Sequence, residues 1–199
     1  TSVHAFATDP RRGIFILAIL VLVIGSSLAL FAWRAPKVGL GGRFGLFSRE
    51  SLLLTNNVLL AVACGSVLLG TLYPLLIDAL GMGKLSVGPP YFDSVFAQLM
   101  FPALFLIGVA PFARWKQASI PELARLLRWA FVTAALVGLT APLLGGEWKP
   151  LVALSLLLAA WIVVTSALNI AQRMRTTRST LWAQPASFLG MHLAHLGVA

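Results

Sequence analysis

The stretch that decides the fold is GIFILAILVLVIGSSLALFAW, residues 13–33, in which no side chain carries a charge. A helix rises 1.5 Å per residue, so about 20 apolar residues span the roughly 30 Å hydrocarbon core of a bilayer. The stretch is also longer than the core of a signal peptide, which has about 7–15 residues. It therefore predicts a transmembrane helix.

Similar apolar stretches recur along the rest of the chain and predict an all-α fold, a polytopic bundle of transmembrane helices. Five spans are complete, and a sixth, too short to cross a bilayer, is cut off by the end of the sequence. Because the chain starts at Thr1 rather than at Met and stops inside an apolar stretch, we interpret residues 1–199 as one transmembrane domain from a longer protein. The predicted spans after the first are 52–80, 94–113, 126–144, 151–171 and 186–199.

Charge determines the expected orientation and excludes a nucleic-acid partner. Only 11% of the residues are charged, against about 25% in soluble domains, and the net charge is +9. The excess of Lys and Arg lies in loops 34–51, 113–125 and 172–185, which the positive-inside rule places in the cytoplasm. The N-terminus and loops 81–93 and 145–150 are then periplasmic. The basic residues thus mark topology, and the expected environment is the lipid bilayer.

Motifs for common enzymatic chemistry are missing from the sequence. It contains no GxSxG, P-loop, CxxC or HExxH pattern, which excludes the usual residues for serine hydrolysis, nucleotide hydrolysis, dithiol exchange and zinc proteolysis. We therefore identify no catalytic residue. The single cysteine, Cys64, lies inside an apolar stretch and is expected to be a buried structural thiol.

Two histidines in the last predicted span are the main candidates for chemistry. His192 and His195 lie about 60° apart on one helical face, while Gly190, Ala194 and Gly197 form a small-residue stripe opposite. The stripe predicts close helix packing, and the histidines predict a polar function or an interhelical hydrogen bond. Both remain open at this point. One polar function open to a histidine in a membrane span is that of a metal ligand, for example to a haem iron. Axial ligands approach a haem iron from opposite faces, so at most one of these two neighbouring histidines could bind a given iron.

Five ordered motifs are distributed along the chain: TSVHAFA at 1–7, FSRES at 47–51 leading to Asn56 and Asn57, GTLYP at 70–74, SVGPPYF at 86–92 and GMHLAHLG at 190–197. Together they resemble the CcmF family, the large membrane subunit of the bacterial cytochrome c haem lyase. Their order and spacing match the family along essentially the whole chain.

This resemblance implies a haem lyase of the bacterial inner membrane. Such a protein accepts haem from a periplasmic haem chaperone and joins it to the CxxCH thiols of apocytochrome c, together with apocytochrome-handling subunits of the maturation complex. By resemblance, His4 ligates transient incoming haem at the periplasmic face. One histidine of the last span ligates a stably bound b-type haem in the membrane. We favour His195 for this role, with His192 as the second choice.

The chain also departs from the family pattern. It lacks the tryptophan-rich WWD segment, two further haem-ligating histidines and the outer domain expected after the last helix, so we expect it to be inactive alone. A secondary transporter or channel is the rival interpretation, with an intramembrane histidine relay and a substrate site in broken helices. A non-enzymatic assembly scaffold is a third. The residues that favour a transporter are Pro74, Pro102, Asn56 and Asn57.

Overall fold

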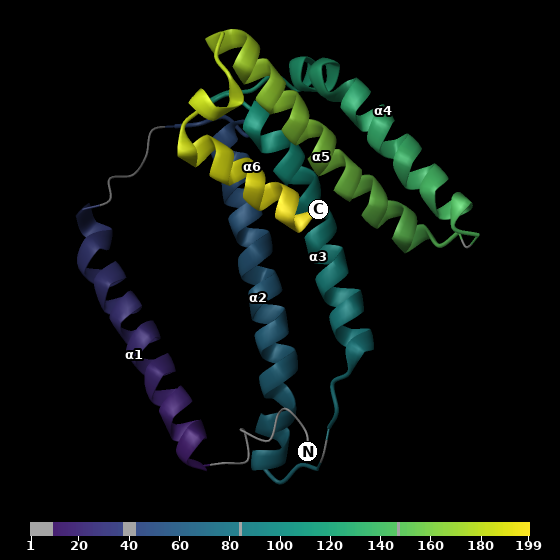
Figure 1. Cartoon of the computed structure of the whole chain (residues 1–199). Helices are drawn as coiled ribbons and strands as arrows, with labels where there is room; N and C mark the ends of the chain where they lie inside the picture. The colour runs from purple at the N-terminus through teal and green to yellow at the C-terminus, as the bar shows by residue number, and fades with distance from the viewer. Residues whose placement is uncertain (1–9, 38–42, 84, 147) are drawn as a thin grey trace. The chain divides into compact units, whose positions relative to one another are not determined.

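The computed structural model describes residues 10–37, 43–83, 85–146 and 148–199, and within these ranges the chain forms helices and no strands (Figure 1). Each predicted span overlaps one α-helix, which confirms the all-α fold class, although the predicted span 94–113 also covers a short 3₁₀ helix. Three short 3₁₀ helices, η2 (Ala35–Lys37), η3 (Ala110–Phe112) and η4 (Leu181–Ala183), lie in the connections. The α-helices are α1 (Pro10–Arg34), α2 (Arg49–Ala79), α3 (Pro89–Val109), α4 (Ile120–Leu144), α5 (Pro150–Thr177) and α6 (Ala186–Val198).

The first five of these helices are long and apolar enough to cross a membrane, whereas α6 has only 13 residues. Large apolar side chains are exposed along all five, as expected for helices that face lipid rather than water. Cys64 of α2 is among the exposed residues, so the prediction of a buried thiol is wrong. An apolar surrounding in sequence does not specify a buried side chain when the solvent is itself apolar.

Contacts divide the chain into two compact units, residues 1–43 and 44–199. The first contains α1, whose two polar side chains within the apolar stretch bond to the helix itself. Ser26 and Ser27 both donate their hydroxyls to the carbonyl oxygen of Val23, at 3.1 and 2.6 Å. Because these hydroxyls need no outside partner, they can lie in hydrocarbon at low cost.

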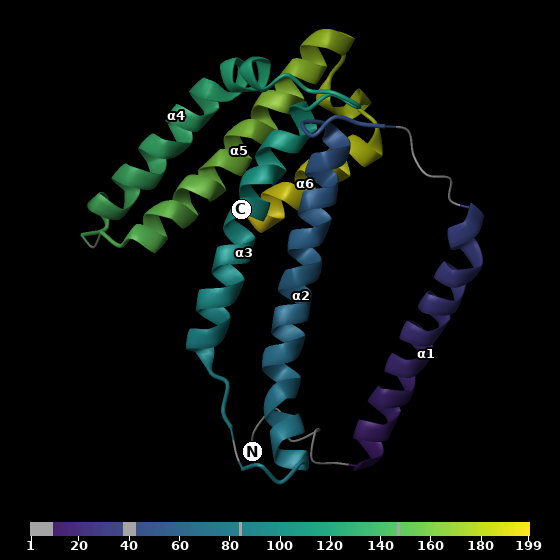
Figure 2. The same ribbon diagram turned by 180° about the vertical axis from the view of Figure 1, so that it is seen from behind.

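In the second unit, α5 is the central helix. It packs against α3, α4 and α6, and α2 packs against α3. Figures 1 and 2 show from opposite sides that α2 runs beside α3 and α4 beside α5. The buried core lies between α4 and α5 and is extended by partly buried side chains of α3. Its fully buried members are Leu127, Ala130, Ala134, Trp161 and Ile162.

Trp161 is the centre of this core and is only 1% exposed. Its ring stacks on Phe105 of α3 with centroids 5.4 Å apart, and its Nε1–H donates to the carbonyl oxygen of Phe105 at 3.0 Å. Gly108 lies against the same indole, where a Cβ would collide with the ring. Further along α4, a Cβ on Gly138 would come within 2.7 Å of the Ala153 carbonyl oxygen. Glycine thus permits the close approach of both helices to α5.

Two helices begin earlier than the hydrophobic pattern predicted. α3 starts at Pro89 rather than near residue 94, and α4 starts at Ile120, followed by Pro121, rather than near residue 126. Proline suits the first turn of a helix because its φ is already helical and its missing N–H has no partner there anyway. Hydropathy alone does not detect such polar or proline-rich first turns.

Prolines inside the spans do not break them. α2 is continuous through Pro74 and α3 is continuous through Pro102. The transporter interpretation needs an unwound segment that exposes backbone groups to a substrate. Within the described residues of α2 and α3 there is none, so the structure removes the main support for that interpretation.

The two basic segments before α2 and before α4 are hydrogen-bonded to each other. The backbone N–H of Gly45 donates to the Lys116 carbonyl oxygen at 2.6 Å, and that of Ala118 donates to the Phe47 carbonyl oxygen at 2.6 Å. Both carboxylate oxygens of Glu50 accept from the Lys116 backbone N–H, at 3.1 and 2.9 Å. Residues 45–50 and 116–118 therefore meet at one end of the second unit.

Candidate functional site

The two histidines of α6 lie where this helix packs against α5. His192 is 2% exposed, and its Nε2–H donates to Oδ1 of Asn169 on α5 at 3.1 Å. The edge of Phe188 packs on the imidazole with ring centroids 4.6 Å apart. One of the two open interpretations, an interhelical hydrogen bond, thus describes His192 in this structure.

Only one of the two ring nitrogens of His192 has a hydrogen-bond partner among the described residues. Its Nδ1 is buried and has no hydrogen-bond partner among the described residues. A buried polar atom without a partner costs about 1–3 kcal/mol, and such atoms are rare unless they have a functional role. The imidazole therefore retains one unused nitrogen inside the protein.

His195 lies one turn further along α6 and is half-buried. Its ring stands edge to face with that of His192, at a centroid distance of 6.3 Å, as residues three apart on one helical face should. Within the described part of the chain, the His195 side chain makes no hydrogen bond. Its imidazole is therefore more accessible to a ligand than that of His192.

The small-residue stripe on the other face of α6 does not pack as predicted. A Cβ placed on Gly190 or on Gly197 would meet no other heavy atom within 4 Å among the described residues. The face that packs is instead the one with His192 and Phe188, because the hydrogen bond to Asn169 and the ring contacts lie there. The sequence identified the two faces of α6 correctly, but it predicted the helix packing contact on the wrong face.

The described residues fit one axial haem ligand rather than a complete pair. Imidazole is a common axial ligand of haem iron. The spans described contribute no histidine besides His192 and His195, and no group of three or more His, Cys, Asp or Glu residues gathers there. The two imidazoles share one face of one helix and cannot approach one iron from opposite sides. A haem held by two protein ligands at this helix would need its second ligand from another segment.

His4, the other predicted ligand, lies outside the described residues.

Two of the motifs that resemble the family are in contact with each other. The hydroxyl of Tyr91, from SVGPPYF, donates to the Ser66 carbonyl oxygen on α2 at 3.0 Å, and its ring covers Gly70 of GTLYP. A Cβ at Gly70 would lie 2.5 Å from that ring. These two motifs therefore fix how α3 leaves the loop beside α2.

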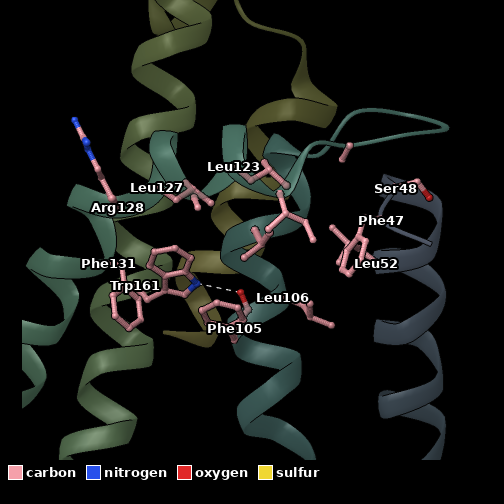
Figure 3. Close-up of a pocket in the computed structure, with 14 residues that line it drawn as sticks. Phe47, Ser48, Leu52, Phe105, Leu106, Leu123, Leu127, Arg128, Phe131 and Trp161 are labelled. Carbon is pink, nitrogen blue, oxygen red and sulfur yellow. Dashed lines mark hydrogen bonds between the residues drawn. The ribbon is translucent and has the colours of Figure 1, made fainter. Parts of the chain in front are cut away.

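A second candidate is an apolar cavity of about 450 Å³ between α2, α3, α4 and α5 (Figure 3). Phe105 and Trp161 form its floor, and Leu52 of α2 faces it from the other side. Arg128 is the one charged residue among the described residues that line it, and Figure 3 shows its side chain extending away from the cavity. The cavity suits an apolar group, and the Oγ of Ser48, the one hydroxyl among the described residues that line it, is hydrogen-bonded to Ser51.

Sequence reasoning missed Asn169, the partner of His192. An amide inside a predicted span is a signal in itself, because polar side chains in membranes usually bond across helices. Its partner was not predictable, since the two residues are 23 positions apart and on different helices.

Comparison with known proteins agrees with the motifs. No family model matches the chain. Among curated proteins, the cytochrome c-type biogenesis protein CcmF of Pseudomonas aeruginosa is 45% identical over 201 residues, covering 100% of this chain and 31% of the relative. CcmF of Escherichia coli is 46% identical over 200 residues, covering 100% of this chain and 30% of the relative. CycK of Bradyrhizobium diazoefficiens, also a cytochrome c-type biogenesis protein, is 38% identical, covering 100% of this chain and 31% of the relative.

A solved structure titled cytochrome c heme lyase CcmF has the same fold over this region. It matches with a TM-score of 0.62 at 24% identity and covers 96% of this chain and 28% of that chain. Fold and spans define a multi-pass helical membrane protein. More particularly, the chain belongs to the CcmF family of cytochrome c-type biogenesis proteins. It spans about a third of the length of the curated relatives that it matches.

Proposed function

We propose that this chain is part of a cytochrome c haem lyase. In the whole protein, haem from a periplasmic haem chaperone would be attached covalently to the CxxCH thiols of apocytochrome c, with apocytochrome-handling subunits of the maturation complex as further partners. The observation that carries this proposal is the match to CcmF proteins along the entire chain, at up to 46% identity. The chain is about a third of such a protein, so we expect it to be inactive alone.

His195 is the proposed ligand of a b-type haem within the membrane. The support is geometric: His192 is engaged with Asn169 through Nε2, whereas His195 has an accessible imidazole on the same face. When bound, haem would supply one-electron redox chemistry, with a potential that depends on the surrounding polarity. In this arrangement His192 orients α6 against α5, and its ring packs against that of the ligand.

His4 is the proposed ligand of transient haem at the periplasmic face. The test compares three variants of the full-length protein. His195→Ala should lose most of the reduced b-type absorbance, because the other axial ligand then faces an open site. His192→Ala should lose much less. His4→Ala should keep the absorbance and abolish cytochrome c maturation.

The optical spectrum and the yield of mature cytochrome c separate these roles. Loss of the b-type spectrum in His192→Ala with retention in His195→Ala would reverse the assignment. Retention in both variants would remove haem ligation from α6. Normal maturation in His4→Ala would remove the periplasmic haem site.

The proposed location is the bacterial inner membrane, with the N-terminus in the periplasm. The charge of the loops supports this orientation. A cysteine replacing Ser86, in full-length protein with Cys64 replaced by Ser, should react with an impermeant thiol reagent applied to the periplasmic side. A cysteine at Ser119 should react only after the membrane is permeabilised. The reverse pattern would overturn the orientation.

A further inference from the structure

A polar cavity of about 520 Å³ lies where α2 begins and where the α5–α6 turn brings these two helices together. Arg49 of α2 and Arg173 of α5 line it, with Thr176 of α5 and Ser187 of α6. The described residues in its lining include no Asp or Glu. The hydroxyl of Thr176 donates to the Gln172 carbonyl oxygen of its own helix at 2.8 Å. The cavity therefore presents mainly two positive charges to whatever enters it.

Both guanidinium groups are positioned by contacts that leave their charge unneutralised. The Arg49 guanidinium lies 5.0 Å from the centroid of the Trp115 ring. That of Arg173 lies 4.9 Å from the centroid of Phe188, and its Nε–H donates to Oε1 of Gln184 at 3.0 Å. Neither arginine forms an ion pair within the described part of the chain.

The nearest carboxylate along the chain from Arg49 is already engaged. Glu50 accepts the Lys116 backbone N–H with both oxygens and does not line the cavity. Aromatic faces hold a guanidinium in place without filling the N–H donors at its rim. The fixed fork of such a group can bind two oxygens of a phosphate at once.

The location of the cavity indicates the source of the phosphate. Arg49 and Arg173 lie at ends of apolar helices, at the same end as the paired loops that precede α2 and α4. This is the level at which lipid head groups meet a membrane protein. Basic pockets between transmembrane helices at such ends bind anionic lipid head groups.

We propose that this cavity binds the phosphate of an anionic phospholipid, held by Arg49 and Arg173. The acyl chains remain in the bilayer, beside the exposed apolar faces of the neighbouring helices. This site uses neither His192 nor His195. Asn169 and Phe188 line the cavity and contact His192, but Arg49→Gln and Ser187→Asp leave both unchanged, so the lipid site and the proposed haem ligation can fail independently.

The test uses the full-length protein in nanodiscs of phosphatidylcholine containing a minor fraction of phosphatidylglycerol. Native mass spectrometry then measures how much phosphatidylglycerol stays bound. Arg49→Gln and Arg173→Gln should each weaken its retention about fivefold, the effect of one cation near an anionic head group. Arg175→Gln is the matched control, because Arg175 lies on the same helix and is exposed outside the cavity.

Ser187→Asp separates a loss of lipid binding from a loss of folding. An acidic residue in the first turn of α6 favours the helix, yet it would repel a phosphate in the cavity. It should therefore keep thermal stability and reduce phosphatidylglycerol retention, while Ser187→Ala, which adds no negative charge, should reduce retention much less. The proposal is overturned if Arg175→Gln matches Arg173→Gln, or if the wild type retains phosphatidylglycerol no better than phosphatidylcholine. Millimolar inorganic phosphate should compete with the lipid where Arg173 binds its phosphate. Equal displacement of the lipid in wild type and in Arg173→Gln would therefore also overturn the proposal.

Discussion

Two nitrogen-containing rings are almost fully buried against their neighbours along α5, and they differ in how completely their polar atoms are paired. Trp161 has one polar atom, and the carbonyl oxygen of Phe105 accepts from it. His192 has two, of which Asn169 pairs one and the other has no partner among the described residues. The burial is the same, at 1% and 2% exposure. The first site is complete as a structural contact, whereas the second retains chemistry that packing does not use.

This difference follows from the environment of each ring. Around Trp161, three helices approach closely, and glycine at position 108 makes room for the indole. Around His192, the contacts among the described residues come from Asn169 of α5 and Phe188 of α6, and the opposite face of α6 is open at Gly190 and Gly197. A ring with one donor is easily satisfied by one neighbouring helix, but an imidazole needs partners on two sides. The α5–α6 contact provides only one of them.

The largest expected effect is that of Trp161→Ala in the full-length protein. Removing a buried aromatic ring typically costs about 3–5 kcal/mol, because a cavity remains where the ring was. Trp161→Phe keeps a stacked ring and should cost less: about 1 kcal/mol for the lost N–H donor, and a further part for the space that the smaller ring leaves. The measurement is the free energy of unfolding in detergent micelles.

The control is Trp129→Ala, since Trp129 on α4 is 67% exposed. If this variant lost as much stability as Trp161→Ala, burial would not explain the role of Trp161, and the comparison with His192 would have no basis.

Asn169→Leu should have an intermediate effect. It leaves both nitrogens of the buried His192 without partners, at a cost of about 1–3 kcal/mol. The double variant Asn169→Leu, His192→Leu removes both polar groups and should recover most of that loss, since replacing both partners by apolar groups is close to neutral. Unfolding measured for the two single variants and the double variant gives the coupling energy. Additive losses would show that the bond does not connect α5 with α6.

These effects also separate what the sequence predicts from what only the fold reveals. The spans follow from hydropathy, because the bilayer directly imposes a minimum apolar length. The partner of His192, the packing face of α6 and the exposure of Cys64 do not follow, because each depends on which helices become neighbours. Hydropathy measures how apolar a segment is, and in a membrane protein apolar side chains face lipid and protein alike. The chemistry of a site inside the bundle is therefore less predictable than the existence of its helices.

The smallest effect is expected at the paired loops outside the bundle, where Glu50 accepts the Lys116 backbone N–H. Lys116 has a positive φ of 65°, which is uncommon for a residue with a side chain. Glu50→Gln weakens the hydrogen bond that holds this backbone, because a neutral amide is a weaker acceptor than a carboxylate. Solvent screens such groups, so proteolysis within loop 113–125 should accelerate only about twofold.

Lys116→Gly should offset the change, since glycine adopts this conformation without strain. Glu122→Gln is the control, because its bond to Arg114 joins two exposed side chains and should contribute almost nothing. If Glu50→Gln accelerated this proteolysis more than Asn169→Leu did under the same conditions, the loops, and not the buried contacts of α5, would hold this unit together.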